Sequence, residues 1–118
     1  MNPLIMNAFG QAELCMHKKI EAALNGKPRL VHYSAYEDDV KNMPIDNLDE
    51  IAAHGACQFK HFTGKLSDIV INPTWLQVAI FANESIEASG DYHHVFLEQI
   101  RFVGEKNHVK RYEVYMGS

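Results

Sequence analysis

The last 47 residues of this 118-residue chain constrain its fold most, because they contain one complete supersecondary unit. A helix is predicted over 73–89, where Asn72 is placed to cap it and Pro73 stands at the first helical position, at which its missing N–H costs nothing. Period-two alternation then predicts a strand over 92–103 and a return strand over 109–116. A helix followed directly by a long β-hairpin indicates a sheet packed against helices.

The 92–103 strand carries apolar residues on both of its faces. One face holds His94, Phe96, Glu98, Ile100 and Phe102, and the other holds His93, Val95, Leu97, Gln99, Arg101 and Val103. A strand that is apolar on both sides belongs in the centre of a sheet or at a contact between copies of the chain, so we predict a homo-oligomer. The hairpin residues predicted to be buried are Phe96, Ile100, Tyr112 and Val114.

The first 71 residues predict a second main helix and the rest of the sheet. Apolar residues recur at three- and four-residue spacing over 7–25, which predicts an amphipathic helix. The shorter elements predicted are a strand over 30–34, a helix over 46–54, and a hairpin over 57–62 and 66–71. The sequence therefore predicts a single α+β domain over residues 1–118, with two main helices packed on a largely antiparallel sheet.

Composition and charge exclude several classes of protein. Apolar residues make up 47% of the chain and charged residues 22%, which is typical of a soluble globular domain. No run approaches the ~18 apolar residues that a membrane span needs, and the N-terminus lacks the basic region of a signal peptide, so we expect a cytoplasmic protein with no membrane partner. The net charge of −4 argues against a nucleic-acid-coating protein. Cys15 and Cys57 are predicted to be buried free thiols.

The adjacent histidines His93 and His94 do not predict a metal site. Neighbouring side chains of a strand point to opposite faces, so these two imidazoles cannot readily chelate one ion. Glu98 shares a face with His94, but four residues of strand place them ~13 Å apart, which is too far for a single metal. We therefore expect no metal and no cofactor.

Glu98 lies between Phe96 and Ile100 on an otherwise apolar stretch. A carboxylate in such a place must be paired, hydrogen-bonded or raised in pKa. The structural interpretation is a pair with Arg101, Arg111 or a helix-end amide. The functional interpretation is a polar contact to a ligand.

Arg101 and Arg111 are the candidate anion contacts, because the planar guanidinium suits phosphate and carboxylate groups. Aromatic residues that can stack a base are Trp75, Phe81, Tyr92, Tyr112 and Tyr115. The alternative is that both arginines pair with surface glutamates, where such pairs contribute little stability. The candidate ligand-binding residues are Phe81, His94, Glu98, Arg101 and Arg111.

No complete catalytic signature is present in the chain. It has no GxSxG, Cys–His or HExxH motif, and its single glycines do not form a phosphate loop. A non-enzymatic binding protein is therefore the main hypothesis, and a small enzyme using His94 and Glu98 is an alternative. A second alternative is a protein–protein inhibitor whose acidic residues mimic phosphates towards a basic partner. Those acidic residues are Glu37, Asp38, Asp39, Asp46, Asp49 and Glu50.

The run 91–98 (DYHHVFLE) follows a helix opened by the run 72–75 (NPTW) and precedes the terminal run 115–118 (YMGS). In these features the chain resembles small phage- and mobile-element-encoded proteins, the Thoeris anti-defence sponge proteins of the first type. The resemblance covers residues 72–118. It implies a non-enzymatic oligomer that sequesters a phosphorylated signal of the cyclic ADP-ribose or cyclic nucleotide type. It further implies aromatic stacking and phosphate contacts, which Phe81, Arg101 and Arg111 are placed to supply.

Overall fold

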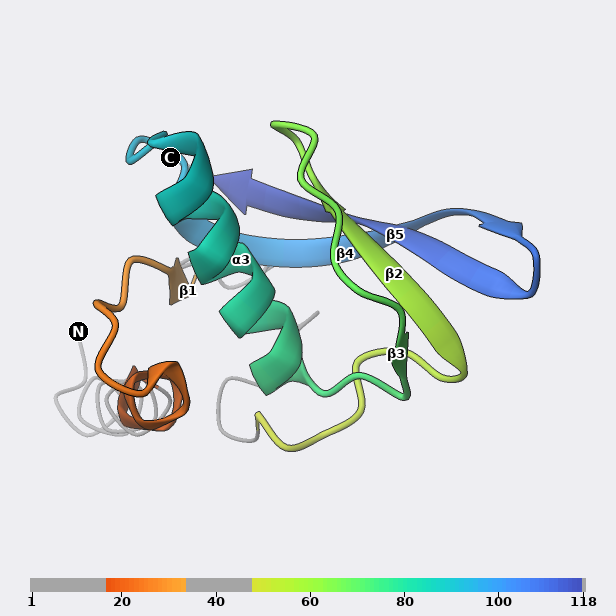
Figure 1. Cartoon of the computed structure of the whole chain (residues 1–118), viewed down its shortest axis with the longest axis horizontal. Coiled ribbons are helices and arrows are strands. Elements are labelled where there is room, and N and C mark those ends of the chain that lie inside the picture. Colours follow the sequence, from red (N-terminus) through yellow and green to blue (C-terminus); the bar gives the residue numbers. More distant parts are fainter. Residues whose placement is uncertain (1–16, 34–47, 118) are drawn as a thin grey trace, which may run out of the picture.

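The computed structural model describes residues 17–33 and 48–117, and Figure 1 shows a twisted sheet crossed on one side by a helix. The elements in chain order are β1 (His32–Tyr33), β2 (Ala56–His61), β3 (Val70–Ile71), α3 (Trp75–Ser89), β4 (Phe96–Lys106) and β5 (Val109–Gly117). Residues 17–24 form a further helical segment, within the range 7–25 predicted for the first helix. Residues 7–16 of that prediction lie outside the described residues.

The α+β class and the C-terminal hairpin are confirmed, but the sheet is mixed. Its strand order is β1-β4-β5-β2-β3. The β4–β5 and β2–β3 pairs are antiparallel, whereas β1 pairs with β4, and β2 with β5, in parallel. Helix α3 is the crossover from β3 to β4. These two strands run in the same direction, and each is antiparallel to its partner, β2 or β5, so β2 and β5 run parallel to each other. The expectation of a largely antiparallel sheet therefore holds for only two of the four pairings.

Helix α3 begins two residues later than the sequence predicted. Its N-cap is Thr74, whose side chain accepts from the Gln77 amide while the Gln77 side chain accepts from the Thr74 amide. Asn72 has a left-handed φ of 49° and accepts instead from the Gly55 amide at 2.6 Å. The end of the helix is as predicted, because Gly90 adopts φ 72° and donates to the Ile86 carbonyl.

The short helix predicted over 46–54 is wrong for the residues that the structure describes, which are 48–54. This segment forms turns and a single bridge between Ile51 and Thr74. Its main-chain carbonyls at Leu48 and Glu50 accept hydrogen bonds from the first-turn amides of α3, at 2.9 and 3.0 Å. These contacts satisfy amides that a helix leaves unpaired, and they require an irregular backbone over 48–50.

Two of the smaller strands are shorter than predicted. β1 covers His32–Tyr33 within the predicted 30–34, and β3 covers Val70–Ile71 within the predicted 66–71. The predicted pairing is nevertheless present, since Cys57 opposes Val70 in antiparallel register. Between the two strands, Lys60 and Leu66 make an isolated bridge and the chain turns at Gly64.

A β-bulge in β4 changes which hairpin residues are buried. The register shifts between Leu97 and Gln99, so Leu97 and Ile100 both face the side of the sheet on which Val114 lies. Leu97, which the alternation assigned to the other face, is consequently fully buried. Of the four hairpin residues predicted to be buried, Val114 is buried, and Phe96, Ile100 and Tyr112 are only half-buried.

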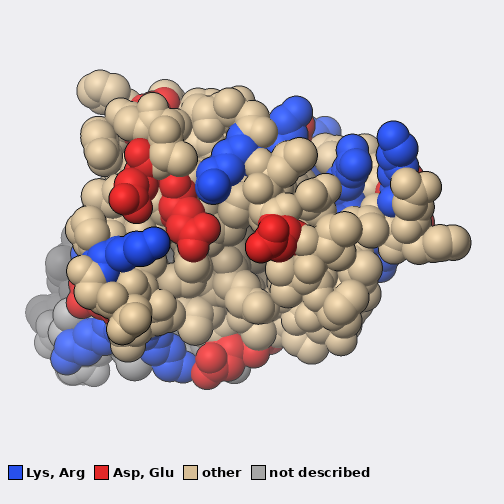
Figure 2. Space-filling model, in the orientation of Figure 1, with Lys and Arg blue, Asp and Glu red and all other residues tan. Residues whose placement is uncertain are grey.

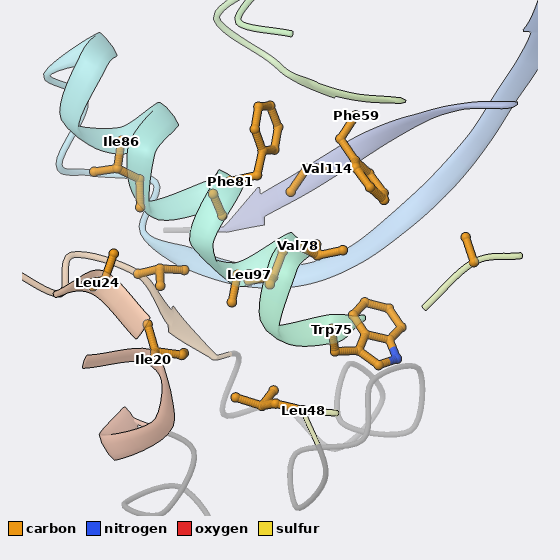
Figure 3. Close-up of a cluster of buried hydrophobic side chains, with 14 of the residues drawn as sticks. Ile20, Leu24, Leu48, Phe59, Trp75, Val78, Phe81, Ile86, Leu97 and Val114 are labelled. Carbon is orange, nitrogen blue, oxygen red and sulfur yellow. The ribbon is translucent and has the colours of Figure 1, made fainter. Parts of the chain in front are cut away.

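The core lies between α3 and the sheet (Figure 3). Helix α3 contributes its buried side chains from one side, and Phe59, Leu97 and Val114 contribute from the strands. Figure 3 also shows Ile20 and Leu24 of the 17–24 helical segment, and Leu48, at the edge of this cluster. The buried residues of α3 are Trp75, Val78, Ala79, Phe81, Ala82, Asn83, Ser85 and Ile86.

One buried polar residue of α3 fixes the chain between the first helix and β1. Asn83 is 1% exposed, and its Oδ1 accepts from the amides of Leu30 and Val31. Its Nδ2 donates to the Pro28 carbonyl at 3.1 Å. Both the oxygen and the nitrogen of the Asn83 side chain are therefore hydrogen-bonded to the segment 28–31. These bonds offset the cost of burying the amide group. Among the described residues, no helix is long and apolar enough to span a membrane.

Candidate functional site

The two sides of the sheet differ in chemistry. Along β5 the buried Val114 and half-buried Tyr112 face α3, and the residues that alternate with them, such as Glu113, face the other way. We name the second side the charged face. It carries Gln58 and Lys60 from β2, Arg101 from β4, and Arg111, Glu113 and Tyr115 from β5. Figure 2 views the opposite, helix side, where acidic side chains lie over α3 and basic ones lie both towards the hairpin and around the N-terminal helical segment.

A groove of about 540 Å³ runs over the hairpin end of the charged face. We name it the hairpin groove, and its lining residues are Gln58, Lys60, Gly64, Leu66, Val103, Gly104, Glu105, Lys106, Arg111, Tyr112 and Glu113. Gly104 stands opposite Arg111 at a second register shift of β4, with φ 155°. A Cβ at Gly104 would meet no atom within 4 Å, so this position leaves the β4 backbone open.

Three basic side chains of the hairpin groove have no partner in the described part of the chain. Lys60, Lys106 and Arg111 make no hydrogen bond or ion pair there, although Glu105 and Glu113 line the same groove. The predicted surface pairing of Arg111 with a glutamate is therefore not present among these residues. Three cations against two carboxylates leave the groove with a net positive charge, which favours an anionic ligand.

Arg101 lies on the same face but outside the hairpin groove. Its guanidinium donates to the Tyr115 hydroxyl at 2.9 Å, and this hydrogen bond raises the pKa of Arg101. Glu113 stands directly across from it on β5 and favours the same charged state. Arg101 thus orients Tyr115, whereas Arg111 is available to a ligand.

A second cavity, of about 310 Å³, lies where β2 ends beside β5. We name it the β2-end pocket, and its lining residues are Lys60, His61, Phe62, His94, Glu113, Val114, Tyr115 and Met116. The β2–β5 pairing stops at His61 and Val114, so the last residues of β5 have no β2 residue beside them. The cavity occupies this end of the strand pair, and Lys60 and Glu113 line both it and the hairpin groove.

His61 is a buried histidine in the wall of the β2-end pocket. It is 1% exposed, and burial lowers its pKa, so that the imidazole is neutral at neutral pH. Its Nδ1 lies 2.6 Å from the Thr63 hydroxyl and accepts from the Thr63 amide at 3.3 Å. The Phe62 ring packs against the imidazole, with centroids 4.4 Å apart.

His94 enters the same pocket from the loop before β4. Its Nδ1 lies 2.9 Å from Asp91 Oδ2, and Asp91 Oδ1 accepts from the His93 amide at 3.0 Å. The bond with His94 and the bond with the His93 amide hold the pKa of Asp91 below its usual value. The edge of His94 also meets Phe62, with centroids 5.3 Å apart, so Phe62 contacts both imidazoles.

The five candidate ligand residues do not form one site. Arg111 lines the hairpin groove and His94 lines the β2-end pocket. Phe81 lies on the helix side of the sheet, 7% exposed and packed against Phe59 at 6.3 Å. It therefore belongs to the core, although its edge borders a third hollow between α3 and residues 65–70.

Glu98 occupies the bulge of β4 and makes none of the three pairs expected for it among the described residues. It is half-buried, and in the described part of the chain it has no hydrogen bond or ion pair with Arg101 or Arg111. Its carboxylate lies over Gly117, where an added Cβ would collide with Oε1. The carboxylate that pairs with His94 is Asp91 rather than Glu98.

The candidate ligand-binding residues drawn from the sequence did not include Lys60, His61, Phe62, Asp91 and Lys106. Two sequence features pointed to some of these residues. Asp91 and His94 are only three residues apart, which allows a side-chain hydrogen bond, and His61 stands two residues after Phe59 and four after Cys57, on the same face of the predicted strand. No group of three metal-ligating side chains forms within residues 17–33 and 48–117. Cys57 is a buried free thiol as predicted, and burial raises its pKa, whereas Cys15 lies outside the described residues.

Comparison with known proteins adds no relative. The chain matches no protein-family model, no curated protein and no solved structure.

Proposed function

We propose that this protein binds a phosphorylated small molecule in the hairpin groove and sequesters it without converting it. The resemblance of residues 72–118 suggests a signal of the cyclic ADP-ribose or cyclic nucleotide type. It also suggests the setting, a phage or mobile-element protein that acts in the host cytoplasm against a defence system.

The observation that carries this proposal is the set of unpaired cations around Gly104. Lys60, Lys106 and Arg111 line one groove, and none of them has an acidic partner in the described part of the chain. Arginine binds phosphate through two parallel hydrogen bonds, and lysine adds a point charge. The glycine leaves room for a phosphate to approach the β4 backbone.

The two glutamates of the groove narrow the class of ligand. Glu105 and Glu113 repel a bare polyphosphate, but carboxylates accept hydrogen bonds from hydroxyl groups. A sugar phosphate offers both kinds of group, with its phosphate towards Arg111 and its hydroxyls towards a glutamate. This combination favours a nucleotide-like ligand over inorganic phosphate.

The lining of the hairpin groove also favours binding without turnover. It contains no histidine, cysteine, serine or threonine among the described residues, so it lacks the Ser–His and Cys–His pairs of common hydrolases. This argument concerns the hairpin groove alone.

Isothermal calorimetry against a panel of cyclic dinucleotides and ADP-ribose derivatives tests the proposal, with chromatography of the recovered ligand. We expect one or more members to bind and to be recovered intact. Hydrolysed or rearranged ligand would instead support an enzyme. If no compound binds and the same protein captures a protein partner, the inhibitor hypothesis is supported. Of the acidic residues named for that hypothesis, the structure describes Asp49, which pairs with Lys19, and the exposed Glu50, whose side chain has no partner among the described residues.

We also propose a homo-oligomer, with the β3 edge as the contact. Within the described residues β3 pairs only with β2. Ile71 of β3 is 66% exposed, and Ile69, directly before the strand, is 57% exposed. An edge strand with exposed apolar side chains is favourable to cover with a second copy. Light scattering at micromolar concentration should give at least a dimeric mass, and Ile71→Lys should shift it to the monomer. A monomeric mass for the unaltered chain contradicts this contact.

A further inference from the structure

The two histidines of the β2-end pocket present opposite hydrogen-bonding groups, and the first of them is His61. A neutral imidazole carries one N–H, on either Nδ1 or Nε2. The Thr63 amide donates to His61 Nδ1, which must therefore hold a lone pair. The proton of His61 consequently lies on Nε2, which makes that atom a donor.

The Nε2–H of His61 is buried and has no acceptor in the described part of the chain. A buried donor without an acceptor costs free energy, and folded proteins rarely retain one unless something else supplies the acceptor. All the other groups around this ring are accounted for, with Thr63 at Nδ1 and Phe62 on its face. The unmet requirement of the pocket is one acceptor atom at His61.

His94 offers the complementary group. Asp91 is ionised at neutral pH, since its pKa is lowered, and a carboxylate can only accept. In the neutral form of His94, Nδ1 therefore donates its proton to Asp91, and Nε2 keeps the lone pair. The His94 side chain is 44% exposed and lines the β2-end pocket.

We propose that the β2-end pocket binds a planar ligand through an amide or lactam edge. The carbonyl oxygen of the ligand accepts from His61 Nε2–H, and its adjacent N–H donates to His94 Nε2. The ring of the ligand lies on Phe62, which is 54% exposed and contacts both imidazoles. Because Nε2 of His61 is itself buried, a neighbouring group has to move to admit the carbonyl oxygen.

The size and charge of the pocket favour this class over an anion. A cavity of about 310 Å³ has room for a single ring with small substituents. A phosphate dianion would satisfy His61 but has no hydrogen to give to His94, whose lone pair would face it. The amide edge is the small group that supplies an acceptor and a donor side by side.

This inference goes beyond the proposed anion site and does not depend on it. The two cavities are neighbours, since Lys60 and Glu113 line both of them. We therefore extend the proposal to a single molecule whose phosphate lies in the hairpin groove and whose amide-bearing ring lies in the β2-end pocket. Only that last step rests on the proposed function.

The test compares 2-pyridone, which carries the amide edge, with N-methyl-2-pyridone, which lacks only the N–H. Two-dimensional NMR of the ¹⁵N-labelled protein at millimolar ligand measures both affinities. We expect 2-pyridone to shift the signals of His61 and His94, and to bind at least tenfold more tightly than its methylated analogue. Equal binding of the two compounds, or binding of neither, overturns the proposal. Since neither compound carries a phosphate, the result is independent of the hairpin groove.

A matched pair of variants assigns the binding to this pocket. His94→Phe keeps an aromatic ring beside Phe62 and removes the acceptor, so the affinity for 2-pyridone should fall at least tenfold. His93→Phe alters the exposed neighbouring imidazole, which lines neither cavity, and should leave the affinity unchanged. An unchanged affinity in His94→Phe overturns the proposal.

The tautomers can be read in the unaltered protein, which keeps the proposal testable if a variant fails to fold. Long-range ¹H–¹⁵N correlation distinguishes a protonated imidazole nitrogen from an unprotonated one. We expect the proton on Nε2 in His61 and on Nδ1 in His94. The same tautomer in both rings would give two donors or two acceptors in the pocket, and that result overturns the proposal.

Discussion

Adjacent residues of β5 show how differently the two sides of this sheet are used. Val114 is 3% exposed and packs in the core below α3, whereas Glu113 lies exposed on the charged face between the two cavities. The same comparison holds on β2, where Phe59 is buried and Lys60 is exposed. Strand alternation therefore separates the residues that stabilise the fold from those available to a ligand, and the separation predicts which substitutions affect which property.

His61 is the exception that joins the two sides. It lies on the helix side of β2 with Cys57 and Phe59, yet it lines a cavity with residues of the charged face. This is possible because the β2–β5 pairing ends at His61, and the cavity wraps around the end of the strand. The two sides of the sheet therefore carry different kinds of side chain along the strands, but residues of both sides line one cavity where β2 ends.

The largest effect expected is on the helix side, from Phe81→Ala. This substitution removes a nearly buried ring packed on Phe59 and leaves a cavity, which should lower the free energy of unfolding by about 3–5 kcal/mol. Urea denaturation measures the change, with the exposed Tyr92→Ala as a control that should cost little. A loss of ligand affinity without a loss of stability would mean that Phe81 belongs to the site.

The next effect is expected from Asn83→Leu, which keeps the size of the side chain and removes its hydrogen bonds. The amides of Leu30 and Val31 would lose their acceptor and the Pro28 carbonyl its donor. Leaving buried backbone groups unpaired should cost about 3 kcal/mol of stability in the same denaturation experiment. The exposed Glu84→Ala on the same helix is the control, and equal stability of the two variants would show that water replaces the amide.

On the charged face, Arg111→Ala should affect binding rather than stability. Losing one charge-assisted contact to a phosphate should weaken a ligand of the hairpin groove by about 1.5–3 kcal/mol, with an unchanged melting temperature. Arg101→Ala is the matched control, because it removes a guanidinium of the same face that contacts Tyr115 and does not line the groove. A greater loss for Arg101 than for Arg111, measured by calorimetry, would place the phosphate at Tyr115 instead.

The smallest effect expected is a pH dependence that originates at His61. Burial lowers its pKa below the ordinary 6.5, so the unfolded chain binds a proton in a range where the folded protein does not. The free energy of unfolding should therefore fall as the pH is lowered below about 6.5. His61→Gln should show a shallower dependence between pH 7 and 5, whatever its stability at pH 7. Asp91 contributes at lower pH. Its pKa is lowered in the folded protein, so the stability that its carboxylate contributes is lost only as the pH falls below about 3.8.

Local sequence determined the elements that depend on neighbouring residues. The apolar spacing over 73–89 and Gly90 gave the body and end of α3, and the alternation over 109–116 gave β5 and the buried Val114. These predictions succeeded because helix period, strand period and a glycine cap act over a few residues. Arg111 was identified from its place on a predicted strand and lies on β5. His94 was predicted to lie in the strand 92–103, but β4 begins at Phe96 and His94 lies in the loop before it.

Tertiary structure alone decided the bulge at Glu98, the parallel pairing of β2 with β5, and both cavities. The bulge reverses the alternation before Gln99, and no local pattern marks it. The pairing brings Lys60 of β2 beside Glu113, and it brings His61 near His94, which is 33 residues later in the chain. Such contacts depend on which strands lie next to each other, and that choice is made by the packing of α3 and the burial of the whole core. A window of neighbouring residues contains no information about it.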